Sequence, residues 1–282
     1  MFNKKQNENE KKKQNENEKQ NKKQNENENE KKKQQIILNR VRQIMKIPYP
    51  LKKSHNSIIP LNIYQTWHTK DLPINMLESI NLIKKLNPRF NHYLFDENDC
   101  REFIKNNFED DVLNSYNNLI PDAYKADLWR YCILYKNGGI YLDIKYKPIN
   151  NFRFISMTEK EYFVLDSDNK RIYNALIVCL PGNKILLKAI NQIVQNVKNK
   201  FYGNDVLDPT GPGLLVEYFK NEEKSKFEMK HKFYFSFENR VIFFNNCIIL
   251  KSYTGYLEDC KKYKNKERYS KLWNKKQIYN DI

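Results

Sequence analysis

Three charged residues near the middle of the chain could act together on one ligand. Asp127 and Arg130 stand three positions apart in a segment with helical periodicity, which makes their side chains neighbours. Asp143 comes directly after the apolar run 140–142, where a buried strand would end beside a crevice. The arrangement would offer a ligand two carboxylates and one fixed cation. The plainer alternative is a surface ion pair next to an ordinary strand end.

The sequence around these residues predicts a helix, a glycine turn and a strand. Pro121 suits the first turn of a helix, and apolar residues follow it at helical spacing. Gly138 and Gly139 come after the last of these residues, and glycine readily takes the left-handed conformation that ends a helix. The run 140–144 is short, apolar and rich in strand formers. This unit would hold the three charged side chains in place.

Alternating elements before this unit predict an α/β fold. The segment 61–67 is typical of a first strand, and 90–95 of a second one, with a helical pattern between them. Asp96 then suits the cap of a further helix. Strand and helix alternate as far as Asp143, which predicts a mostly parallel central sheet with helices on both faces. We expect residues 59–282 to form this domain.

The motifs Ala126-Asp127-Leu128-Trp129-Arg130-Tyr131 and Gly138-Gly139-Ile140-Tyr141-Leu142-Asp143 resemble a known family. They are similar to the sugar transferases with a DXD motif, glycosyltransferase family 32, which are related to the initiating alpha-1,6-mannosyltransferase. The resemblance implies a GT-A-like fold that binds a nucleotide-sugar. It also implies that Asp127 and Arg130 contact the donor, and that Asp143 holds a divalent cation, Mn²⁺ or Mg²⁺, on the donor's diphosphate. All three would be catalytic residues.

One position departs from the family pattern. Where the family has the second aspartate of its DXD motif, this chain has Lys145. Strand alternation would place residues 143 and 145 on the same face, so the ammonium should lie close to the carboxylate. Two outcomes follow: either Lys145 contacts the diphosphate directly and metal binding is weak, which we favour, or Asp143 alone binds the metal and Lys145 points past it to solvent.

Further site residues follow from the same resemblance. Trp67 is a candidate for stacking on the donor base, and a core tryptophan is an equally good interpretation. Trp273 would close over the donor, or else anchor the C-terminal segment to the core. The expected donor-binding residues are Trp67, Asp127, Arg130, Tyr131, Gly139, Lys145 and Trp273. The expected acceptor-side residues are Asn174, Thr210, Gly211 and Pro212.

A literal DxD occurs at Asp166-Ser167-Asp168, between the strand-like runs 161–165 and 172–179. It competes with Asp143 for the role of metal ligand. Aspartate, serine and asparagine are typical of a hairpin turn at this position, and we assign the segment to such a turn. Asp143 therefore remains the predicted metal ligand.

The N-terminal segment differs in composition from the rest of the chain. Residues 1–35 consist mainly of lysine, asparagine, glutamine and glutamate, and we expect them to be a disordered tail. Residues 36–58 would form a short basic amphipathic helix and a linker. Such a helix either packs on its own domain or makes a peripheral contact with an anionic membrane.

Composition limits the classes of function. The chain has 282 residues, 40% of them hydrophobic, which is enough for one good-sized domain. Its net charge of +16 favours an anionic partner: nucleic acid, an acidic membrane or a nucleotide diphosphate. The five cysteines show no CxxC spacing and should be reduced core thiols. The sequence shows neither a signal peptide nor a membrane span, which predicts a soluble intracellular, cytoplasmic protein.

We therefore expect a hexosyltransferase that uses a GDP- or UDP-sugar and a glycan, lipid or protein acceptor. The family resemblance implies that the configuration of the sugar is retained. Two alternatives stay open: a transferase-like scaffold without catalysis, which Lys145 suggests, and a basic nucleic-acid-binding protein. Nucleic acid is the weaker alternative, because the aromatic residues mostly follow strand and helix periodicities, as core residues do.

Overall fold

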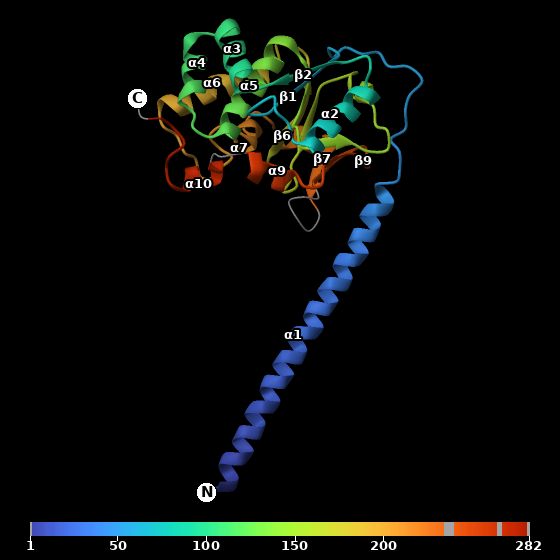
Figure 1. Cartoon of the computed structure of the whole chain (residues 1–282), viewed down its shortest axis with the longest axis vertical. Helices are drawn as coiled ribbons and strands as arrows, with labels where there is room; N and C mark the ends of the chain where they lie inside the picture. The colour runs from blue at the N-terminus through green and yellow to red at the C-terminus, as the bar shows by residue number, and fades with distance from the viewer. Residues whose placement is uncertain (1, 234–239, 264–266, 281–282) are drawn as a thin grey trace. The chain divides into compact units, whose positions relative to one another are not determined.

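The computed structural model describes residues 2–233, 240–263 and 267–280 (Figure 1). It comprises two compact units, residues 1–46 and 47–282. The second unit begins earlier than the expected residue 59, because side chains tie the preceding segment to the domain. Tyr49 stacks on Phe244 with ring centroids 4.8 Å apart, and the Ser57 and Thr158 hydroxyls lie 2.7 Å apart.

The N-terminal unit is described as one long helix, where composition predicted a disordered tail and a short helix. Helix α1 runs from Phe2 to Ile44 and takes in both the expected tail and the expected short helix. Lysine, glutamate and glutamine are good helix formers, and pairs such as Glu28 and Lys32 stand four positions apart, where opposite charges stabilise a helix. Composition indicated only that the segment lacks apolar surface to bury, and residues 22–37 are indeed exposed. A lack of burial does not exclude a helix.

The second unit is built on one sheet whose strands follow the order β2-β1-β3-β6-β5-β7-β8-β9-β4. The strands are β1 Asn62–Thr66, β2 Asn91–Phe95, β3 Gly139–Leu142, β4 Tyr146–Pro148, β5 Tyr162–Leu165, β6 Ile172–Cys179, β7 Met229–Phe233, β8 Arg240–Phe244 and β9 Cys247–Ser252. The α/β class that the sequence predicted is confirmed.

Parallel pairing, which the sequence predicted for most of the sheet, joins β2 to β1, β1 to β3 and β5 to β7. The other neighbours in the sheet are antiparallel. Short connections explain some of these antiparallel pairs. The segments between β5 and β6 and between β8 and β9 are too short for the crossover that parallel neighbours need. The sheet is therefore mixed, and its parallel part lies beside the candidate site.

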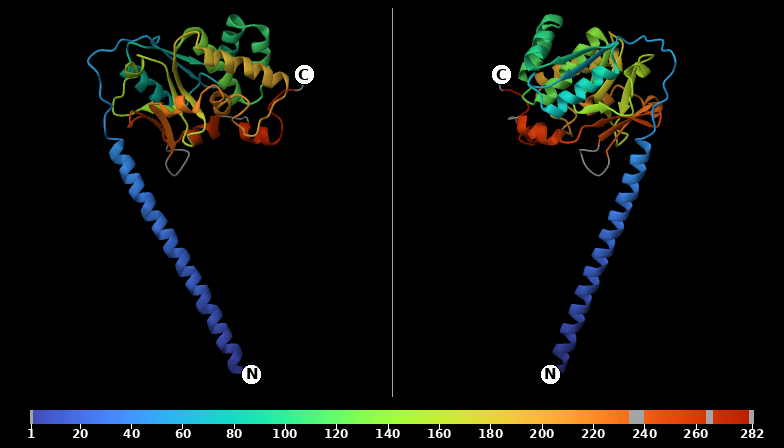
Figure 2. Two further views of the ribbon diagram at one scale, coloured as in Figure 1. Left: turned by 180° about the vertical axis from the view of Figure 1, so that it is seen from behind. Right: turned by 45° about the vertical axis from the view of Figure 1, so that its right-hand side comes forward.

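Helices cover both faces of this sheet (Figure 2). They are α2 Ile74–Leu86, α3 Glu97–Asn107, α4 Asp110–Asn118, α5 Asp122–Asn137, α6 Lys184–Lys198, α7 Pro212–Val216, α8 Asn221–Ser225, α9 Tyr256–Tyr263 and α10 Tyr269–Asn274, with a 3₁₀ turn at Phe154–Met157. The side chain of Asp96 caps α3, as predicted, by accepting a hydrogen bond from the Asp99 amide at 2.9 Å.

The core lies on both sides of the sheet because alternate strand residues face opposite ways. Tyr64 and Tyr141 belong to a cluster with residues of α5 and α6. Ile63 and Ile140, their neighbours in the chain, belong to a second cluster with residues around the 3₁₀ turn. The strands that lead to the candidate site are therefore fixed from both faces.

All five cysteines are free, and Cys100, Cys132 and Cys179 are buried, which agrees with the expectation of reduced core thiols. Among the described residues, no helix combines the length and the apolar character that crossing a membrane would require.

Candidate active site

The turn from α5 to β3 sets the position of the candidate site. Gly138 has φ of 60° and Gly139 has φ of 106°, conformations that favour glycine. A Cβ on Gly138 would lie 2.6 Å from atoms of Pro181, and one on Gly139 would lie 2.8 Å from the Asn62 carbonyl oxygen. The glycines therefore allow the strand to begin at once, and β3 brings Asp143 beside α5, as the sequence predicted.

Asp127 and Arg130 form a buried ion pair. They expose 8% and 6% of their surface, and the Arg130 guanidinium lies 3.2 Å from an Asp127 carboxylate oxygen. Arg130 also donates hydrogen bonds to the carbonyl oxygens of Ala126 and Asn174, at 3.1 and 2.7 Å. Its guanidinium carbon lies 4.3 Å from the centre of the Tyr141 ring. This burial excludes the alternative of an ordinary surface pair.

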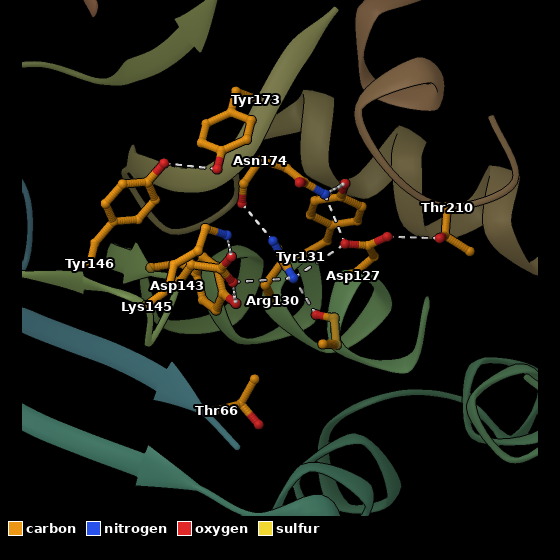
Figure 3. Close-up of polar contacts among 12 residues, drawn as sticks. Thr66, Asp127, Arg130, Tyr131, Asp143, Lys145, Tyr146, Tyr173, Asn174 and Thr210 are labelled. Carbon is orange, nitrogen blue, oxygen red and sulfur yellow. Dashed lines mark hydrogen bonds and ion pairs between the residues drawn. The ribbon is translucent and has the colours of Figure 1, made fainter. Parts of the chain in front are cut away.

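Residues from three separate segments converge on Asp127 (Figure 3). Its carboxylate accepts hydrogen bonds from the Asn174 amide at 2.9 Å and from the Thr210 hydroxyl at 2.8 Å. A Cβ on Gly211 would lie 3.1 Å from the same carboxylate. Burial raises the pKa of Asp127, while Arg130 and the two hydrogen bonds act against that shift. Two of the four expected acceptor-side residues, Asn174 and Thr210, thus hold Asp127.

Asp143 lies between two cations. The Lys145 ammonium forms a short ion pair with one carboxylate oxygen, and the Arg130 guanidinium lies 3.8 Å from the other. The Tyr141 hydroxyl donates a hydrogen bond to Asp143 at 2.8 Å. Burial alone would raise the pKa of Asp143, but Lys145 and Arg130 outweigh it, and the pKa falls well below its ordinary range. Asp143 is therefore held as a carboxylate.

Lys145 is buried and enclosed by aromatic rings. Its ammonium lies 5.2 Å from the centre of the Tyr146 ring and 5.6 Å from that of Tyr173. The two tyrosine hydroxyls lie 2.8 Å apart. Burial acts to lower the pKa of Lys145, but the Asp143 carboxylate outweighs it and the pKa is raised. Lys145 is thus a fixed cation that faces Asp143 and is backed by two tyrosines (Figure 3).

A family model matches the part of the chain that contains this cluster. The family is described as a glycosyltransferase sugar-binding region containing a DXD motif, and the match covers residues 73–173. The matched segment includes Asp127, Arg130, Asp143 and Lys145. The matched segment, about a third of the chain, is thus similar to this DXD-containing glycosyltransferase family.

Known proteins that are similar to the chain include two mannosyltransferases. The initiation-specific alpha-1,6-mannosyltransferase of Candida albicans is 25% identical over 244 residues, which cover 68% of this chain and 61% of that protein. Inositol phosphoceramide mannosyltransferase 3 of Schizosaccharomyces pombe is 32% identical over 96 residues, or 34% of this chain and 27% of that protein. The chain thus spans less than two thirds of the length of either relative.

Among solved structures, the PaToxG glycosyltransferase matches with a TM-score of 0.44 and 20% sequence identity. The match covers 56% of this chain and 67% of that one.

The side chains at the motif position do not suit a cation held by two aspartates. Asp143 is its single carboxylate at the motif, and that carboxylate already receives the Lys145 ammonium and the Tyr141 hydroxyl. Within the ranges that the structure describes, no three His, Cys, Asp or Glu side chains gather closely enough to hold a metal ion. Mn²⁺ and Mg²⁺ prefer several oxygen ligands, and a neighbouring ammonium repels them.

The second DxD forms the turn between β5 and β6 that the sequence predicted. The Asp168 carboxylate pairs with Arg171 at 2.7 Å. The Asp166 carboxylate lies 2.7 Å from Nδ1 of His231. Each aspartate thus has a basic partner of its own.

The structure places the other predicted residues as follows. The Tyr131 hydroxyl accepts a hydrogen bond from the Asn174 amide at 2.8 Å and so belongs to the cluster. Pro212 is the first residue of α7.

Trp67 is 4% exposed and lies in a core cluster with residues of α2. The Trp273 indole donates a hydrogen bond to the Tyr202 carbonyl at 2.7 Å.

The site also contains residues that the sequence did not indicate. Tyr141 stands two positions before Asp143 on the same strand, so alternation could have placed both on one face. Tyr146, Tyr173 and His231 come together only through strand pairing, and no local pattern marks them.

Proposed function

We propose that this chain is a retaining hexosyltransferase, which moves a sugar from a GDP- or UDP-linked donor to a glycan, lipid or protein acceptor. The observation that carries the proposal is the buried cluster in which Arg130 and Lys145 both lie against Asp143. The match to the DXD family model supports the class of donor, and the similarity to mannosyltransferases supports a hexose.

The cluster has the chemistry that transfer from a diphosphate requires. Breaking the bond between sugar and phosphate leaves negative charge on the departing oxygen, and fixed cations in a site shielded from water stabilise that charge. Arg130 is oriented by two backbone carbonyls before any ligand arrives. A guanidinium held in this way is a fixed positive charge that needs no reorganisation when a phosphate binds.

We further propose that Lys145 supplies part of the charge that the family obtains from a metal ion. Its ammonium stands against the carboxylate at which a cation would bind, so it would meet a diphosphate directly. Lysine binds phosphate as a point charge and needs no metal to do so. Donor binding should then depend only weakly on Mn²⁺ or Mg²⁺.

Asp127 would accept a hydrogen bond from a hydroxyl group of the donor's ribose or sugar. A carboxylate offers about four acceptor positions, and three of those of Asp127 face Asn174, Thr210 and Arg130. The hydrogen bonds of Asn174 and Thr210 fix the direction in which the remaining position points. These two residues are thus positioning residues for the donor.

A screen of GDP- and UDP-hexoses tests the proposal. We expect at least one donor to raise the melting temperature of the protein and to be hydrolysed or transferred. The Asp143→Ala variant should lose roughly a hundredfold or more in turnover while it remains folded. If no donor stabilised or reacted with the wild type, the proposal would be overturned.

The inactive scaffold is the second candidate, because Lys145 already occupies the carboxylate of the motif. It predicts a donor that stabilises the protein and is never turned over, with or without metal. The same screen therefore separates the two candidates.

A further inference from the structure

A histidine–aspartate pair lies buried close to the candidate site. His231 on β7 is 3% exposed, and its Nδ1 lies 2.7 Å from a carboxylate oxygen of Asp166 in the β5–β6 turn. Asp166 also accepts a hydrogen bond from the Ser167 amide at 2.6 Å. Two segments that are distant in sequence are thus joined by a hydrogen bond to a charged group, which is among the stronger kinds.

The bond fixes the state of the imidazole. Burial acts to raise the pKa of Asp166, but His231 and the Ser167 amide outweigh it and lower that pKa, so the carboxylate only accepts. Nδ1 of His231 therefore carries the proton. Burial lowers the pKa of His231, with Lys145 and Arg240 acting in the same direction and Asp166 against them, which favours the neutral ring. Nε2 is buried and has no hydrogen-bond partner among the described residues.

The His231 ring lies flat against Tyr173. The ring centroids are 3.8 Å apart and the planes differ by 6°. Tyr173 in turn meets the Tyr146 hydroxyl at 2.8 Å, and the two tyrosine rings enclose the Lys145 ammonium. A continuous set of contacts thus leads from Asp166 to Lys145.

We propose that Asp166 and His231 form a positioning pair for Lys145, which gives the second DxD of the chain a role other than metal binding. The pair holds the Tyr173 ring in place, and the ring holds the ammonium against Asp143. Only one part of this proposal, the contact between Lys145 and a diphosphate, rests on the function proposed above. The position of the ammonium itself can be tested without any donor.

The experiment compares matched variants. His231→Phe keeps a flat ring against Tyr173 and removes the bond to Asp166, and Asp166→Ala removes the same bond from the other side. Asp168→Ala is the control from the same turn, because Asp168 pairs with Arg171 instead. His92→Phe is the second control, at a half-buried histidine outside the site. Its Nε2 lies 2.7 Å from Gln65, and it stands on β2 at the far edge of the sheet.

Two measurements are made on each variant. The first is the rate at which acetic anhydride modifies Lys145, followed by mass spectrometry of the peptide. The second is the affinity for GDP and UDP, without metal, measured by calorimetry. The double variants His231→Phe/Lys145→Ala and Asp166→Ala/Lys145→Ala complete a cycle that isolates the coupling.

We expect His231→Phe and Asp166→Ala to raise the labelling rate of Lys145 severalfold, and the two controls to leave it unchanged. The affinity for the nucleotide should fall by roughly tenfold, the equivalent of one such hydrogen bond, and Lys145→Ala should abolish this effect. The melting temperature of His231→Phe should stay close to that of the wild type, because the change also removes an unpaired buried nitrogen.

The outcomes are distinct. Unchanged labelling of Lys145 in both variants overturns the positioning pair, whatever happens to nucleotide binding. A raised labelling rate in a protein that binds neither GDP nor UDP supports the pair and counts against the proposed function. A loss of affinity that persists in the Lys145→Ala background would show a purely structural role and overturn the inference.

Discussion

At the scale of single residues, Asp143 links the site to the stability of the fold. Lys145 and Arg130 hold its pKa well below the ordinary value, against the effect of burial. A carboxyl whose folded pKa is depressed stabilises the protein above its unfolded pKa of about 4 and loses that contribution as the pH falls further. Asp143 should therefore stabilise the folded state at neutral pH and cease to do so in acid.

The Asp143→Asn variant measures this contribution. The difference in melting temperature between wild type and variant should be largest at neutral pH and shrink steadily below about pH 4. The comparison isolates one group, since the other carboxyls are common to both proteins. A difference that stayed constant down to pH 3 would count against the ion pairs of Asp143.

Lys145 allows a direct test of metal dependence. With a donor and no metal, Lys145→Ala should bind roughly tenfold or more weakly than the wild type, because a cation in contact with the diphosphate is lost. Lys145→Asp restores a second carboxylate and should make binding depend strongly on Mn²⁺. Calorimetry with and without Mn²⁺ gives both results. If the wild type needed metal absolutely and Lys145→Ala bound as well, lysine would have no part in the site.

At the scale of elements, the glycine turn between α5 and β3 should be the most sensitive backbone feature near the site. Gly139→Ala combines a positive φ with a Cβ placed 2.8 Å from the Asn62 carbonyl oxygen. We expect a loss of about 2–4 kcal/mol in the free energy of unfolding, from backbone strain together with the clash. Urea denaturation measures it.

Gly182→Ala is the matched control. Gly182 also has a positive φ, 76°, but a Cβ there would meet no atom within 4 Å. Its substitution should cost only the backbone term, about 1–2 kcal/mol. An equal fall in the free energy of unfolding for the two variants would show that the β1 backbone shifts to accommodate the added methyl group.

The elements that the sequence predicted are those with local signals. Pro121 and Gly138 bound α5, and Asp127 and Arg130 lie on it three apart, so spacing alone brought them together. The approach of His231 to Tyr173 depends on how β7 enters the sheet beside β5, and no neighbouring residue records that pairing. Asp127 and Arg130 could therefore be predicted from the sequence, whereas Tyr173 and His231 could not.

At the scale of the whole molecule, the N-terminal segment should be separable from the α/β domain. Deleting residues 1–35 should leave the melting temperature and donor affinity unchanged, because residues 22–35 are exposed. The far-ultraviolet circular dichroism should nevertheless lose helical signal, since those residues lie within α1. A large fall in melting temperature would show that the segment packs on the domain, and an unchanged spectrum would show that it is not helical.

The conformation of α1 also determines how far apart its own ends are held. At a rise of about 1.5 Å per residue, its 43 residues make a rod roughly 65 Å long. A flexible chain of the same 43 residues would have a root-mean-square end-to-end distance of about 33–39 Å. As a helix, the segment is thus a stiff spacer whose two ends lie nearly twice as far apart as those of a flexible chain of the same length.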